Sequence, residues 1–89
     1  MRLRQESNDA GVQFLFTELA TAHTFLDIAD VTESAETRDR NLRNAYEAYS
    51  AAMRYSPGVA LTVEQAADLG QKIRDLKARL AGAGYDAAF

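Results

Sequence analysis

Residues 12–29, VQFLFTELATAHTFLDIA, decide the fold class of this chain. Large or apolar side chains recur in this stretch at steps of three and four residues, which is the period of one face of an α-helix. The positions on this face are Val12, Leu15, Phe16, Leu19, Ala22, His23, Leu26 and Ala29. The pattern predicts a long helix that starts after Ser7, Asn8 or Asp9, ends near Val31 and turns this face to a core.

Three large apolar residues of the same helix lie outside that face. Phe14, Phe25 and Ile28 are more than about a quarter turn away from it, so the helix carries a second apolar stripe. A further helix or a binding partner must cover this stripe. Together with Tyr55, on the outer side of the second helix, these three residues are our candidate partner-binding residues.

A second helix follows the short polar turn Thr32-Glu33-Ser34 and ends before Pro57-Gly58. Its core stripe is formed by Arg38, Leu42, Ala45, Tyr46, Tyr49, Ala52 and Met53. Because the connection is short, the first two helices are predicted to form an antiparallel hairpin in which facing residues have numbers that add to about 65. This register places Phe16, Leu19, Tyr46 and Tyr49 at the centre of the core, and Asp27 or Asp30 within salt-bridge reach of Arg38.

The third helix has the clearest start signal, because Thr62-Val63-Glu64-Gln65 has the pattern of a capping box. Gly82-Ala83-Gly84 marks its end. We therefore expect an all-α three-helix bundle, made of a long antiparallel hairpin and a third packing or capping helix. Residues 9–82 form the single domain, residues 1–8 a flexible N-terminal tail and residues 83–89 a C-terminal tail.

The hairpin resembles a tetratricopeptide repeat at two places. Ala45-x3-Tyr49-x2-Ala52-x4-Pro57 resembles the second helix of that repeat, and Phe16-x2-Leu19-Ala20-x2-His23 resembles its first helix. The gap between the two half-patterns is longer than the repeat allows, so the match is to a single, elongated unit. The resemblance implies a right-handed helical hairpin that binds peptides or other proteins.

Composition limits the classes of function. The 89 residues are 47% hydrophobic and 26% charged, as in globular proteins, and contain no cysteine, which excludes disulfides and thiolate zinc sites and fits the cytoplasm. The formal net charge of −3 disfavours nucleic acid as a partner. The N-terminal residues are polar where a signal peptide is apolar, and no run of about 18 apolar residues occurs, so we expect neither export nor a membrane partner.

The only histidine offers the one constellation with possible chemistry. His23 precedes Asp27 and Asp30 on the same helix, a spacing that suits metal binding or proton transfer. We interpret His23 as a structural residue instead, because it points to the hairpin seam and Arg38 is available to the two aspartates. No phosphate loop, metalloprotease, calcium-loop or nucleophile-elbow motif occurs, so we expect no enzyme activity, no cofactor and no metal site.

Two hypotheses of function follow. The first is a protein–protein interaction module that binds a protein or peptide through apolar surface left on the hairpin, with at least one of Phe14, Phe25 and Tyr55 accessible to solvent. The alternative is a homo-oligomeric structural protein. In that case the third helix would pair with a second copy through a seam formed by Leu69, Ile73, Leu76 and Leu80.

Overall fold

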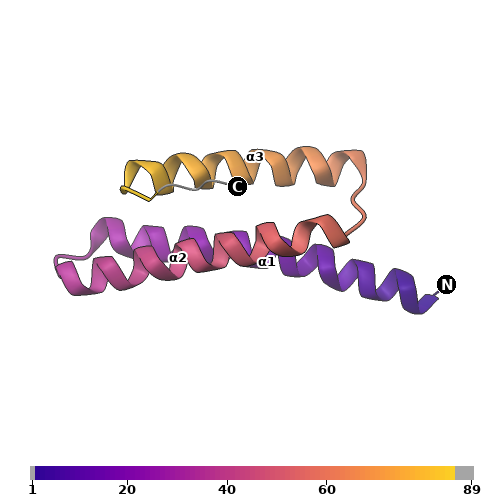
Figure 1. Cartoon of the computed structure of the whole chain (residues 1–89), viewed down its shortest axis with the longest axis horizontal. Coiled ribbons are helices and arrows are strands. Elements are labelled where there is room, and N and C mark those ends of the chain that lie inside the picture. The colour runs from indigo at the N-terminus through magenta and orange to yellow at the C-terminus, as the bar shows by residue number, and fades with distance from the viewer. Residues whose placement is uncertain (1, 86–89) are drawn as a thin grey trace.

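The computed structural model of the chain describes residues 2–85, with side chains from residue 8 onward. Within this range it contains three α-helices and no strand: α1 (Arg2–Val31), α2 (Ala35–Tyr55) and α3 (Val63–Gly82), with a short 3-10 turn, η1 (Ser56–Gly58), after α2. Helices α1 and α2 form an antiparallel hairpin, and α3 lies along one side of it in the direction of α1 (Figure 1). The predicted all-α three-helix fold is confirmed. The bundle is elongated, with extents of 50 × 20 × 18 Å.

Helix α1 begins earlier than the sequence predicted. It starts at Arg2, so residues 2–8 are helical where a tail was expected. Residues 3–6 are mostly good helix formers, and no proline or glycine separates them from the predicted helix. Asn8, a candidate N-cap, instead binds the chain between α2 and α3: its Nδ2 donates to the Ala60 carbonyl over 2.9 Å, and its Oδ1 accepts from the Ala60 amide over 2.8 Å.

The starts of α2 and α3 follow the predicted capping chemistry. Ser34 caps α2, since its hydroxyl accepts a hydrogen bond from the Thr37 amide over 3.1 Å. In α3 the Gln65 amide donates to the Thr62 hydroxyl and the Thr62 amide donates to the Gln65 side chain, each over 3.0 Å. This reciprocal pair confirms the capping box, which satisfies donors that the helix itself leaves without a partner.

The end of α3 is a Schellman motif. Gly84 adopts φ +92°, its amide donates to the Ala81 carbonyl over 3.0 Å, and the Tyr85 amide donates to the Leu80 carbonyl over 2.9 Å. The reversal brings the Tyr85 ring to 5.5 Å from the ring of Tyr46, against the core. Residues 83–85 of the expected tail therefore belong to the bundle, and residues 86–89 lie outside the described residues.

The core lies between the hairpin and α3. Among its largest side chains, those with no exposed surface are Leu15, Leu19, Tyr49, Leu76 and Leu80. Leu19 and Tyr49 thus occupy the centre, as predicted, but Phe16 and Tyr46 are only partly buried and pack against the core from its edge. Phe16 lies beside α3, where the Lys72 ammonium is 5.8 Å from its ring centroid.

Replacing Leu19 with alanine tests this placement of the core. The substitution removes buried apolar surface and leaves a cavity, so we expect it to lower the free energy of unfolding by about 3–4 kcal/mol. Ile28→Ala on the same helix is the matched control, because Ile28 is 40% exposed and its loss should cost less than about 1 kcal/mol. Urea unfolding followed by circular dichroism measures both values. Equal losses would contradict the burial described above.

The buried phenol of Tyr49 predicts a loss of stability at alkaline pH. Burial, with a smaller contribution from Tyr46, raises the pKa of Tyr49 above its usual value of 10.0. The folded state therefore resists ionisation that the unfolded chain undergoes, so the stability from this residue is complete below about pH 10 and is lost as pH rises through the folded pKa. Unfolding free energies at neutral pH and near pH 11 should differ less in Tyr49→Phe than in the parent. Tyr55→Phe, at an exposed tyrosine, should match the parent.

Candidate functional site

Helix α3 covers one side of the hairpin with the apolar stripe that the sequence indicated. Leu69 is 5% exposed, and Leu76 and Leu80 are fully buried against the hairpin. Ile73 is partly buried in the same seam. The seam that the homo-oligomer hypothesis assigns to a second copy is thus already filled within one chain.

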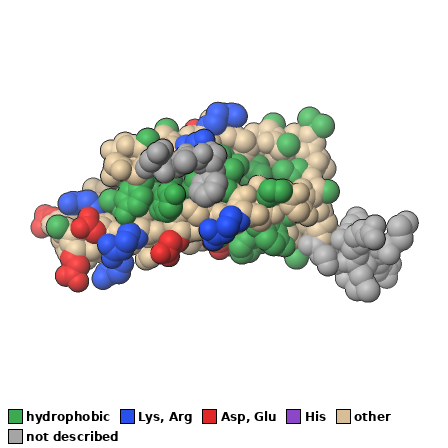
Figure 2. All heavy atoms as spheres, viewed as in Figure 1, with side chains coloured by type: hydrophobic (Ala, Val, Ile, Leu, Met, Phe, Trp, Pro, Cys, Tyr) green, Lys and Arg blue, Asp and Glu red, His purple; other side chains and the backbone are tan. Residues whose placement is uncertain are grey.

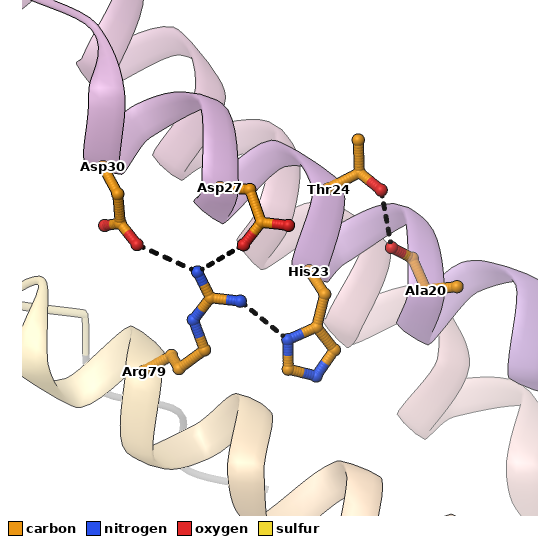
Figure 3. Close-up of polar contacts among 6 residues, drawn as sticks. All are labelled: Ala20, His23, Thr24, Asp27, Asp30 and Arg79. Atoms are coloured by element: carbon orange, nitrogen blue, oxygen red, sulfur yellow. Dashed lines mark hydrogen bonds and ion pairs between the residues drawn. The ribbon is translucent and has the colours of Figure 1, made fainter.

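A polar cluster joins α3 to α1 near the C-terminal end of α3. The Arg79 guanidinium binds three side chains on successive turns of α1 (Figure 3). Its Nη2 donates to Asp27 Oδ1 over 2.9 Å and to Asp30 Oδ2 over 3.0 Å, and its Nη1 lies 3.0 Å from His23 Nδ1. Because a guanidinium has no acceptor, His23 Nδ1 must be the acceptor of that bond.

These contacts give His23 a structural role. The imidazole and the two carboxylates that could have formed a metal or proton-transfer site are instead held by one cation. No group of three or more His, Cys, Asp and Glu side chains in the described part of the chain is placed to hold a metal ion. The cluster therefore serves to fix α3 on α1.

The predicted pairing of Arg38 with Asp27 or Asp30 is wrong. Arg38 Nη2 donates instead to the Thr32 carbonyl over 3.1 Å, within the turn between α1 and α2. The register was predicted from the two helices of the hairpin alone. Helix α3 packs beside α1 and brings Arg79 to both aspartates. Arg38 and Arg79 both line a hollow of about 330 Å³ at this end of the bundle.

Removing the Arg79 charge should weaken the bundle in a salt-dependent way. The two aspartates are about 70% exposed, so each ion pair is weak, but Arg79→Met removes all three interactions of the guanidinium at once and should cost about 1–2 kcal/mol. Arg38→Met, which removes only an exposed hydrogen bond to a carbonyl, should stay within about 0.5 kcal/mol of the parent. Denaturation at low and high salt measures both, and a larger loss in Arg38→Met would overturn the assignment.

The second apolar stripe lies on the opposite side of α1. Its row, Phe14, Glu18, Thr21, Phe25 and Ile28, is offset by about half a turn from the row that meets α3, which includes Phe16, His23, Asp27 and Asp30. We call this side of the hairpin the open face. It is formed by the row Phe14 to Ile28 on α1 and by four residues of α2: Asn44, Glu47, Ala48 and Tyr55. Phe14 is 39% exposed and Tyr55 is 47% exposed, which confirms the predicted accessibility.

Phe14 and Tyr55 form one aromatic surface across the two helices. Their ring centroids are 4.8 Å apart with an interplanar angle of 60°, an edge-to-face arrangement. Gly11 leaves room beside this pair, since a Cβ there would lie 3.1 Å from Val59 and 3.2 Å from the Tyr55 ring, which is tighter than an ordinary contact. Figure 2, drawn from one side, shows hydrophobic side chains at the surface over much of the bundle, with most of the visible acidic side chains towards the end that holds the α1–α2 turn.

A shallow groove occupies the middle of the open face. It is lined by Glu18, Thr21, Phe25, Asn44, Glu47 and Ala48. Phe25 is partly buried and packs against the core from this side, and Ala48 is 7% exposed. The groove thus has an apolar floor with one carboxylate from each helix beside it.

The four candidate residues are brought together only in part. Phe14 and Tyr55 touch, Phe25 lines the groove, and Ile28 lies one turn further along α1, 40% exposed. The sequence interpretation missed Gly11 and the two glutamates. The glutamates could have been found from the sequence, because the numbers of Glu18 and Glu47 add to 65 and the predicted register therefore places them opposite each other.

Comparison with known proteins yields no relative: no family model, no curated protein and no solved structure matches the chain. The resemblance to a tetratricopeptide repeat therefore stays a prediction. None of the helices that the structure describes combines the length and the apolar character needed to cross a membrane.

Proposed function

We propose that this chain is a small helical protein–protein interaction module, without catalytic activity, that binds a protein or peptide through the open face. The observation that carries the proposal is the exposed pair of Phe14 and Tyr55, one ring from each helix, on the side of the hairpin that α3 does not cover. Rings held in this way present apolar area without a large entropic cost on binding, as interface anchors do.

The packing beneath the pair supports this role. Gly11 lies beside the Tyr55 ring, and the edge of that ring packs against Phe14 of the same face. Further along the same row of α1, after Glu18 and Thr21, Phe25 and Ile28 add apolar surface. A row of this kind suits a partner that lies along the hairpin, in the manner of the tetratricopeptide-like unit that the sequence suggests.

The site of action that we propose is the cytoplasm. The absence of cysteine from all 89 residues supports it, because a reducing compartment gives a small protein no disulfides to use.

Removing the aromatic pair tests the proposal. We expect tagged parent protein to retain specific proteins from a lysate of its source cells, and Phe14→Ser/Tyr55→Ser to lose them, because the double variant removes both anchors. Val63→Ser is the matched control, since Val63 is 87% exposed at the start of α3 and is not one of the residues of the open face.

Circular dichroism must first show that both variants keep the parent's helical content. The proposal predicts the same retained proteins for the parent and Val63→Ser only. Equal retention by all three forms, or no specific retention by any, would contradict it.

A further inference from the structure

One side of the hairpin already binds an amphipathic helix of the same chain. α3 is an amphipathic helix whose leucine seam, Leu69, Leu76 and Leu80, fills the space between α1 and α2. Basic side chains flank this seam on the α1 side. Arg79 binds Asp27 and Asp30, and the Lys72 ammonium lies 5.8 Å from the Phe16 ring centroid.

The open face repeats these features, and no element among residues 2–85 covers it. Phe14 and Phe25 of α1 and Tyr55 of α2 offer apolar surface on this side, as the other side offers its own apolar residues to α3. Glu18 and Glu47 lie beside the groove, one from each helix. Neither carboxylate forms an ion pair with another side chain between residues 8 and 85.

We infer that the partner of the open face presents an amphipathic helix with lysine or arginine beside its apolar seam. The inference rests on the proposed function and specifies the chemistry of the partner. A basic side chain at the groove would pair with the carboxylates that line it, Glu18 of α1 and Glu47 of α2. An acidic or uncharged helix gains nothing from these two groups.

The spacing of the open face defines the helix further. Phe14 and Phe25 are eleven positions apart, about 16 Å along the axis, and Glu18 lies between them. A helix lying along α1 would meet the two rings with apolar residues eleven positions apart. If this helix runs parallel to α1, its basic residue comes four positions after its first apolar anchor; if it runs antiparallel, the basic residue comes seven positions after it. In both cases the two anchors and the basic residue lie on one helical face.

Charge argues against a second copy as the occupant. Two open faces related by a twofold axis through the groove would bring Glu18 and Glu47 of one copy toward the same residues of the other. Like charges placed together at an interface oppose association. A partner of opposite charge has no such penalty.

Two synthetic helical peptides of about 20 residues test the inference. They share a leucine seam with apolar anchors eleven positions apart and differ only in carrying lysine or glutamate beside it. Fluorescence anisotropy with the full chain should show that the lysine peptide binds about tenfold more tightly than the glutamate peptide. In Glu18→Lys/Glu47→Lys the order should reverse.

The matched control is Glu33→Lys/Asp39→Lys, which makes the same change in net charge at two exposed acidic residues outside the groove. It should keep the parent's preference for the lysine peptide. Equal binding of both peptides, binding of neither, or reversal in this control as well would overturn the inference. So would a dimer in sedimentation that Phe14→Ser/Tyr55→Ser disperses, because a second copy would then occupy the face.

The same titrations separate this inference from the proposed function. If the parent binds both peptides equally and Phe14→Ser/Tyr55→Ser binds neither, the open face is an interface but its charge does not select the partner. If the double variant binds the lysine peptide as well as the parent does, the aromatic pair is not the anchor and the proposed function fails.

Discussion

A pair of antiparallel helices has a groove on each of its two sides, and a single further helix can fill only one of them. Here α3 fills one side with Leu69, Leu76 and Leu80, which are buried against α1 and α2. Apolar residues on the other side have no covering element among residues 2–85, so Phe14 and Tyr55 keep 39% and 47% of their surface exposed. The open face is a direct consequence of building a bundle from one hairpin and one helix.

The choice of side is set by polar chemistry as well as by the leucine seam. Both sides of the hairpin carry apolar residues, but His23, Asp27 and Asp30 form a row on one side only, and Arg79 binds all three. Such exposed contacts add little stability individually, yet they are directional and would be absent if α3 lay on the other side. The Thr62 capping box fixes where α3 begins.

Local signals in the sequence predicted most of the fold. The Thr62 capping box, a hydroxyl cap at the start of α2 and the glycines that end α3 depend on neighbouring residues, and the structure confirms them. The core stripes are confirmed only in part, because Leu19 and Tyr49 are buried whereas Arg38, which the sequence placed in the stripe of α2, is exposed. The partners of Arg38 and Arg79 could not be predicted, because the arginine side chain is long and flexible and the position of Arg79 depends on how α3 docks. Phe14 and Tyr55 were found as outliers from the core stripes, whereas their contact could be seen only with the register of both helices.

We propose that partners bind to the open face and leave α3 in place. Amide chemical-shift mapping of the labelled full chain, during titration with the lysine-bearing helical peptide, tests this most directly. The largest shifts should fall on Phe14, Glu18, Phe25, Glu47 and their neighbours, with Leu69, Leu76 and Leu80 unchanged because the seam beneath them is not disturbed. Shifts concentrated on the exposed side of α3, or broad shifts through the α3 seam that indicate displacement of that helix, would contradict the claim.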